Sequence, residues 1–242
     1  MSQSSVCLNL KDVSLTFKTR KGFFRYTQHY ALKDVSFQVF KGETLGVIGR
    51  NGCGKSTLLK VLAGILKADS GELVSNVNYI SLQSLATGFD RQLSGRDNAI
   101  LSAMLLGHSK EHALNAIPDI IEFSELGDAF DQPVKSYSSG MRSRLGFSVA
   151  MLMEADVLLV DETLGVGDTR FKRKAEKAIL SKINSDQTVV FVSHSAGQVK
   201  RLCSRVVWLE QGEVKKVGPA DELVDEYEEF VQMERGRRNR NK

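Results

Sequence analysis

At 242 residues, the chain is long enough to form a hydrophobic core that needs no disulfide bonds for stability. Its 42% hydrophobic and 26% charged residues are typical of a globular protein, and its three cysteines lie too far apart for a disulfide framework or a zinc site. The net charge is +4, and five basic side chains lie in the last eight residues. The rest of the chain has 28 basic and 29 acidic residues, so it has no excess of positive charge. We therefore expect no nucleic-acid partner.

The first third of the chain is predicted to form strands, a glycine-rich loop and a helix. Residues Val6–Phe17 and Ala31–Phe40 alternate apolar and polar side chains, which is the period of a strand. The segment between them, Lys18–Tyr30, is long for a hairpin connection and interleaves cations with aromatic residues. Further elements are expected at Thr44–Ile48 (strand), Lys55–Leu66 (helix), Glu72–Val74 and Val77–Leu82 (strands).

The pattern becomes helical from about Leu93 to Met153, with Ser94 as a plausible N-cap and Asp97 in the first turn. Strand signals then return, separated by helical stretches. The strands are expected at Val157–Val160, Thr188–Val192, Val206–Leu209 and Val214–Val217, and the helices at Arg170–Ile183, Ala196–Cys203 and Asp221–Met233.

This alternation predicts an α/β fold with a mainly parallel core sheet, an antiparallel β part and an inserted helical lobe at about 93–153. We expect a single domain over residues 1–242 that ends in a basic tail at 234–242. The longest apolar stretch, Phe147–Met153, falls short of the ~20 residues that a membrane helix needs. In a transport system, another chain would therefore supply the membrane path.

One motif carries the strongest chemical signal. The eight residues Gly49, Arg50, Asn51, Gly52, Cys53, Gly54, Lys55 and Ser56 match G-x-x-x-x-G-K-[ST] between a predicted strand and a predicted helix, with Thr57 next. Backbone amides of such a loop and the helix N-terminus cradle phosphates. Lys55 is expected to reach the β- and γ-phosphates of ATP, and the Ser56 hydroxyl to ligate Mg²⁺. Cys53 is either a thiolate activated by the helix N-terminus or a small, inaccessible filler.

Other candidate residues follow later strands or begin a helix. Asp161 and Glu162 come directly after an apolar strand, where Asp161 would hold Mg²⁺ and Glu162 would act as general base on the attacking water. His194 follows the next strand and could contact the γ-phosphate. Residues Tyr137–Arg142 open a helix with small side chains that offer a second anion cradle or a simple N-cap at Ser138 or Ser139.

Taken together, these motifs resemble the ATP-binding cassette of ABC transporters over roughly Cys7 to Met233, with Asp168 as a further match. The resemblance implies that two copies pair head to tail, so that Ser138 and Gly140 of one chain face the ATP held by Lys55 of the other. ATP hydrolysis would then reopen the dimer.

The chain departs from the family pattern in the signature, which usually has two adjacent glycines and a glutamine where this chain has Ser139, Gly140 and Met141. Two other family positions have more than one candidate here. The tyrosine that stacks on adenine is replaced by Phe17, with Tyr30 as a rival. The glutamine that joins Mg²⁺ is expected at Gln83, although Ser84 could take that place.

The sequence Ser138–Phe147 and the Gly165–Asp168 segment resemble the subfamily that exports capsule, O-antigen and teichoic-acid polymers. That resemblance implies an ATPase at the cytoplasmic face of the inner (plasma) membrane, bound to two copies of a polytopic permease and powering export of a lipid-linked polysaccharide. It also implies a short helix within Lys18–Tyr30 that helps receive the lipid-pyrophosphate end of the substrate. The competing interpretation is a loop that packs Phe23 and Phe24 onto the sheet and stabilises the adenine pocket. The alternatives are an ABC ATPase for another exported substrate, such as a lipid, drug or protein, or a soluble ABC ATPase that serves no transporter.

Overall fold

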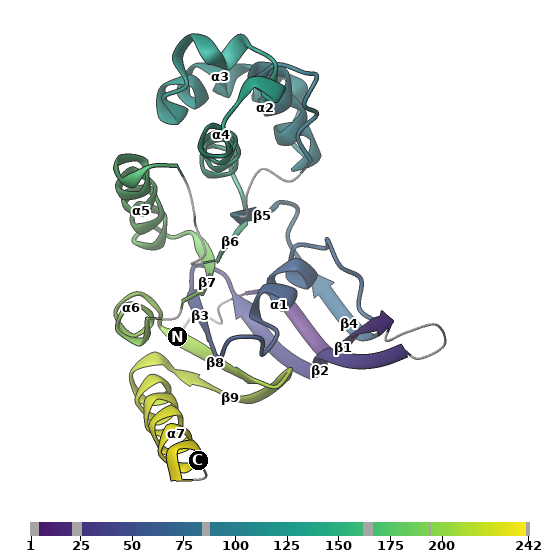
Figure 1. Ribbon diagram of the computed structural model, residues 1–242, viewed down its shortest axis with the longest axis vertical. Helices are drawn as coiled ribbons and strands as arrows, with labels where there is room; N and C mark the ends of the chain where they lie inside the picture. Colours follow the sequence, from purple (N-terminus) through teal and green to yellow (C-terminus); the bar gives the residue numbers. More distant parts are fainter. Residues whose placement is uncertain (1–4, 21–25, 84–87, 162–166, 194, 241–242) are drawn as a thin grey trace. The chain divides into compact units, whose positions relative to one another are not determined.

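The chain forms both strands and helices in a computed structural model, which describes residues 5–20, 26–83, 88–161, 167–193 and 195–240 (Figure 1). The chain divides into two units. The first comprises residues 1–76 and 188–242, and the second comprises residues 77–187. The second unit is larger than the predicted helical lobe, because it includes the strands before and after the lobe and the helix that follows.

The first unit contains a three-stranded antiparallel sheet in the order β2-β1-β4 (Figure 1). Its strands are β1 (Val6–Arg20), β2 (Tyr26–Phe40) and β4 (Ser70–Ser75). The ladder between β1 and β2 continues to the pair Arg20↔Tyr26. Most of the segment that we expected to be an inserted loop or short helix is therefore strand; residues 21–25, with Lys21 and Phe23, lie outside the described residues.

A β-bulge in this hairpin decides which side chains share a face. Leu15 pairs with Leu32, but Thr16 pairs with Tyr30, so Ala31 is an extra residue on β2. Directly paired residues point to the same face of a sheet, and successive residues alternate. Phe17 therefore lies on the face of the buried Leu15 and Leu32, whereas Tyr30 lies on the opposite face with Thr16.

The first unit also holds a mainly parallel sheet segment. Strand β3 (Thr44–Ile48) pairs in parallel with β7 (Thr188–Val192) and β8 (Arg205–Glu210), and β9 (Glu213–Pro219) pairs antiparallel with β8. Every residue of β3 and β7 is buried, as their continuous apolar sequences predict.

Three helices accompany these strands: α1 (Lys55–Leu62), α6 (Ala196–Leu202) and α7 (Ala220–Arg240). Helix α1 ends four residues earlier than predicted, and Gly64 follows with a positive φ of 70°. Helix α7 continues through most of the segment that we expected to be a tail. Trp208 of β8 makes edge contacts with Tyr227 and Phe230 of α7, which fix this helix on the strand.

In the second unit, β5 (Ile80–Gln83) pairs in parallel with β6 (Val157–Asp161). Ser94 caps the first helix as predicted, because its hydroxyl accepts a hydrogen bond from the Asp97 amide at 3.0 Å. The remaining elements are α2 (Gly95–Leu105), α3 (Lys110–Ser124), the 3₁₀ turns Gly127–Asp131 and Val134–Ser136, α4 (Ser139–Leu152) and α5 (Thr169–Ile183). Over the described ranges, no helix combines the length and the apolar character that crossing a bilayer requires.

The helices of the second unit meet at a cluster of three phenylalanines. Phe171 of α5 stands edge-on to Phe123 of α3 at 5.9 Å and to Phe147 of α4 at 6.0 Å, and it is 1% exposed. This ring therefore joins three helices that are far apart in sequence.

Replacing Phe171 with alanine should lower the free energy of unfolding by about 3–5 kcal/mol, since it leaves a large cavity between these helices. Urea unfolding followed by circular dichroism measures the change. Leu105→Ala is a matched control, because Leu105 is 84% exposed and its loss should be close to neutral. Equal stabilities of the two variants would contradict the role given to the phenylalanine cluster.

Candidate functional site

The glycine-rich loop after β3 is held between two backbone carbonyl groups. A Cβ atom on Gly49 would lie 2.0 Å from the carbonyl oxygen of Leu209 in β8, and one on Gly54 would lie 2.3 Å from that of Ala31 in β2. Both glycines also have positive φ values, of 154° and 109°. Only glycine fits these two positions, so the loop and its two neighbouring strands fix one another.

Lys55 is buried at the start of α1, where it is 6% exposed. Its ammonium group donates hydrogen bonds to the carbonyl oxygens of Gly49 at 2.6 Å and Arg50 at 3.0 Å. The N-cap residue, Gly54, provides no side-chain cap, so the first amides of α1 can bind an anion. Asn51, Gly52 and Ser56 are exposed and Thr57 is half-buried, which gives the predicted phosphate cradle an open side.

Arg50 also connects the loop to the C-terminal helix. Its guanidinium lies 3.7 Å from the carboxylate of Glu234 in α7, and both side chains are about one-third exposed. Sequence reasoning missed Glu234, because no local pattern relates a residue of the last helix to the loop.

The structure favours the second of our two interpretations of Cys53. The thiol is 4% exposed, and its burial raises the pKa of Cys53 despite the opposing charge of Lys55. The alternative of an activated thiolate is disfavoured in this conformation, because desolvation outweighs the pKa-lowering effect of Lys55. Cys53 is a small residue that packs inside the loop.

The two candidates for adenine stacking lie on opposite faces of the β1–β2 hairpin. A Cβ atom on Gly54 would lie 3.2 Å from the side chain of Leu32. The face of the hairpin that carries Leu32 is therefore the one next to the phosphate loop. Phe17 shares this face and is 44% exposed, whereas the bulge turns Tyr30 away. The pairing therefore favours Phe17 over Tyr30 as the residue on the side of the phosphate loop. His29, which the sequence did not single out, pairs with Phe17 and shares its face.

Two candidate metal ligands end neighbouring strands. Gln83 pairs in parallel with Val160, so the backbones of Gln83 and Asp161 reach the same edge of the β5–β6 pair. Oxygen ligands from an amide and a carboxylate suit Mg²⁺. Glu162, Ser84 and His194, and the side chain of Gln83, lie outside the described residues.

The start of α4 carries the second predicted anion cradle. The hydroxyl of Ser138 accepts a hydrogen bond from the Met141 amide at 3.1 Å, so Ser138, and not Ser139, is the N-cap. A Cβ on Gly140 would lie 3.7 Å from the Cα atom of Gly167, which precedes α5. The beginnings of α4 and α5 are therefore neighbours.

Asp168 caps α5 through two hydrogen bonds that its Oδ1 accepts from the amides of Arg170 at 3.0 Å and Phe171 at 2.9 Å. These bonds hold the pKa of Asp168 below its ordinary value. The carboxylate is therefore ionised and oriented, and it lies at the exposed end of the helix next to the start of α4.

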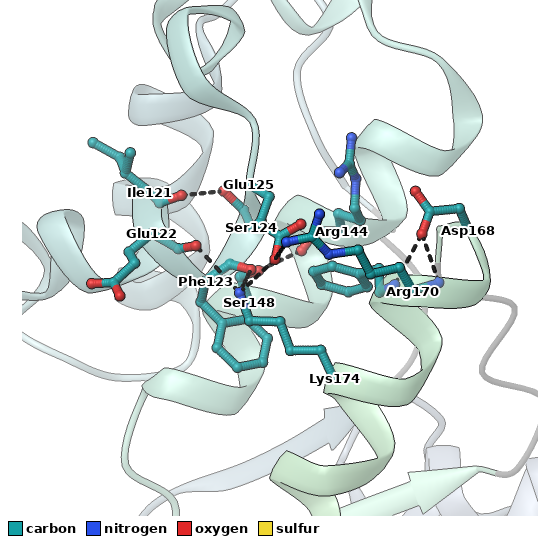
Figure 2. A network of polar contacts seen from close by, with 11 residues as sticks. Ile121, Glu122, Phe123, Ser124, Glu125, Arg144, Ser148, Asp168, Arg170 and Lys174 are labelled. Atoms are coloured by element: carbon teal, nitrogen blue, oxygen red, sulfur yellow. Dashed lines mark hydrogen bonds and ion pairs between the residues drawn. The ribbon is translucent and has the colours of Figure 1, made fainter.

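A polar network that the sequence did not reveal fixes this end of α5 (Figure 2). The Lys174 ammonium donates hydrogen bonds to the Phe123 carbonyl at 2.9 Å and to the Glu125 carboxylate at 3.0 Å, and it lies 4.7 Å from the centre of the Phe123 ring. Glu125 ends α3 in a left-handed conformation. Since such a contact joins positions about fifty residues apart, only tertiary structure could identify it.

Alkylation tests the environment of Cys53. In the native protein at mildly alkaline pH, we expect iodoacetamide to leave Cys53 unmodified, because the reagent needs an accessible thiolate. All three cysteines should react in denaturant. Cys203 is an internal control, since burial raises its pKa to about 12. Native modification of Cys53 at the rate of a free thiol would show that the loop opens.

Comparisons with known proteins agree with this geometry. A family model described as ABC transporter matches residues 32–165. The teichoic acids export ATP-binding protein TagH of Listeria innocua is 44% identical over 202 residues, which are 84% of this chain and 60% of that protein. The chain therefore spans about three-fifths of this relative. The O-antigen export system ATP-binding protein RfbB of Klebsiella pneumoniae is 40% identical over 92% of this chain and 90% of its own length.

Solved structures share the fold at lower identity. The dimeric cassette MJ0796 bound to ADP and Pi is 21% identical with a TM-score of 0.70, and covers 88% of this chain and 98% of its own. The ATP-binding subunit of another ABC transporter is 23% identical with a TM-score of 0.71, and covers 91% of this chain and 93% of its own. The family model and the relatives show that this chain belongs to the ABC transporter family, as an ATP-binding cassette.

Proposed function

We propose that this chain binds ATP with Mg²⁺ and hydrolyses ATP to power export of a lipid-linked polysaccharide. The observation that carries the proposal is the preformed phosphate loop, in which a buried ammonium group meets the uncapped start of a helix. A loop already held between two strands loses little conformational entropy when it binds a phosphate chain.

Each reacting part of ATP has a proposed partner in this chain. The loop amides bind the phosphates, and Lys55 exchanges its bonds to Gly49 and Arg50 for bonds to the β- and γ-phosphates. Ser56, Gln83 and Asp161 supply hard oxygen ligands for Mg²⁺, which neutralises phosphate charge when bound. Glu162 takes a proton from the attacking water, and His194 orients the γ-phosphate.

Phe17 is proposed to stack on adenine. The pairing of the hairpin supports this assignment, because Phe17 faces the side of the sheet that carries the phosphate loop. His29 lies next to it on the same face and is a second candidate for contact with the base.

A second copy of the chain is proposed to complete the site. The cassette MJ0796 is dimeric, and the relevant groups of this chain lie together: Ser138 and Gly140 at the start of α4, and Asp168 at the start of α5. Two adjacent helix N-termini offer amides and a favourable dipole to the phosphates held by the other copy.

The names of the relatives support a glycan polymer as the exported substrate. Both the teichoic-acid and the O-antigen proteins are at least 40% identical to this chain. A membrane permease in two copies would provide the path and hold the chain at the cytoplasmic face of the inner (plasma) membrane. The alternatives are export of a lipid, drug or protein, and a soluble role outside transport. An assay of polymer at the cell surface distinguishes polysaccharide export from both.

Glu162→Gln should retain ATP binding and lower hydrolysis roughly 10²- to 10⁴-fold, because the amide cannot accept the proton of the attacking water. Phosphate release and ATP affinity of the purified protein measure the two effects. Glu154→Gln makes the same chemical change at an exposed turn after α4 and should leave turnover unchanged. Wild-type turnover in the Glu162 variant would refute the assignment.

The same variants test the transport role in cells. Cells that carry only Glu162→Gln should keep their lipid-linked polymer inside, whereas the Glu154→Gln control should restore surface polymer. Normal surface polymer in cells whose only copy is inactive would reject polysaccharide export while leaving the ATPase assignment in place.

Phe17→Ala should weaken ATP binding about 2- to 10-fold through loss of ring stacking. Competition with a fluorescent ATP analogue gives the affinity. Tyr30→Ala is the matched control, because Tyr30 lies on the opposite face of the hairpin, and this variant should bind ATP normally. The reverse result would mean that the nucleotide lies on the other face of the hairpin.

A further inference from the structure

The face of the β1–β2–β4 sheet that carries Tyr30 has a polar depression of about 570 Å³. Alternate residues of β1 and β2 line it, together with the residues that begin β4. The lining includes Thr16, Lys18, Gln28, Tyr30, Asp69 and Ser70. This face is opposite to the one that holds Leu32 and Phe17, so the depression is separate from the proposed nucleotide site.

A chain of hydrogen bonds fixes the polar groups of this depression. Gln28 donates from Nε2 to the Thr16 hydroxyl at 3.3 Å, and that hydroxyl donates to Asp69 Oδ2 at 2.6 Å. The Thr16 amide donates to the same oxygen at 2.7 Å. These two bonds hold the pKa of Asp69 below its ordinary value, so the carboxylate is ionised at neutral pH.

The depression also offers an aromatic surface. The side chain of Tyr30 is 50% exposed, so its ring is accessible to a ligand. Along the depression β1 pairs with β2, whereas its pairing with β4 ends at Ser14 and the Thr16 amide bonds to Asp69 instead. The groups that line this face are side chains of both strands and of the residues next to β4.

We propose that this depression binds a saccharide unit, with Tyr30 as the platform for the sugar ring and Asp69, Gln28 and Lys18 as partners for its hydroxyl groups. The identification of the ligand as a glycan rests on the proposed export function; the geometry of the depression does not.

The chemistry of the lining fits a neutral, hydroxyl-rich ligand. Each sugar hydroxyl can donate one hydrogen bond and accept two, so it needs both acceptors and donors nearby. Asp69 accepts, Lys18 donates, and the Gln28 amide does both. One carboxylate and one ammonium leave the lining without the excess of positive charge that would favour a polyanion. The C–H face of a sugar ring packs against an exposed aromatic ring.

The test uses the full chain and a panel of neutral oligosaccharides: maltotetraose, mannotetraose, galactobiose and chitotetraose. A glycerol-phosphate trimer serves as the anionic comparison. Saturation-transfer NMR gives the dissociation constants. We expect at least one neutral sugar to bind at millimolar concentration and the anionic trimer to bind less well.

A substitution on one face should weaken the binding of one ligand and leave the binding of the other unchanged. Tyr30→Ala should weaken sugar binding roughly 3- to 10-fold and leave ATP binding unchanged, whereas Tyr30→Phe keeps the ring and should bind sugar nearly as well as the wild type. Phe17→Ala should weaken ATP binding and leave sugar binding unchanged. Asp69→Asn, which keeps the shape of the side chain, should also weaken sugar binding.

Three results would overturn the proposal: no sugar binding by protein that binds ATP normally, sugar binding that survives both Tyr30→Ala and Asp69→Asn, or a preference for the glycerol-phosphate trimer. A chain that bound sugar without binding ATP would instead count against the proposed ATPase function.

Discussion

Two close approaches of backbone to backbone hold the phosphate loop, and much of the first unit depends on them. The carbonyl group of Leu209 blocks any side chain at Gly49, and that of Ala31 blocks any at Gly54. The turn after β8 adds a third tie, since the Gly212 amide donates to the Cys53 carbonyl at 2.9 Å and the Gly212 carbonyl accepts from Lys33 at 2.8 Å. A parallel strand, an antiparallel hairpin and the loop are thereby joined through their backbones.

In the second unit, glycines also allow a close approach of backbone to backbone, here between the starts of two helices. Side-chain oxygens of Ser138 and Asp168 cap α4 and α5, and the glycines beside them allow the two helix ends to approach closely. Behind this pair, Lys174 binds the end of α3 and the Phe171 ring packs against α3 and α4. The polar ends of the helices are therefore positioned by an apolar cluster a short distance away.

The sequence predicted best those features that depend on contiguous residues. The Ser94 cap and the bounds of β3 and β7 follow from local patterns, and burial on both faces explains the continuous apolar sequences of these strands. A cap at the start of α4 was also expected, but the choice of Ser138 over Ser139 needed the structure. The sequence could not reveal the environment of Cys53, which depends on the neighbouring Glu210 and on burial by distant elements. It could not reveal Glu234 or Lys174 either, since their partners come from other parts of the chain. The carboxylate pair after β6 is only partly described, so Glu162 stays a prediction.

The bulge at Ala31 explains why the choice between Phe17 and Tyr30 could not be made from the sequence. Regular alternation along β2 would place Tyr30 on the same face as Leu32, and the extra residue reverses this order. The alternation of side chains along β2 is therefore shifted by one residue at the bulge, so Leu32 and Tyr30 point to opposite faces of the sheet. A deletion of one residue at the bulge would move Tyr30 to the face of Leu32 while the residues of β1 kept their faces, so it would mix the two surfaces in a way that no single substitution can.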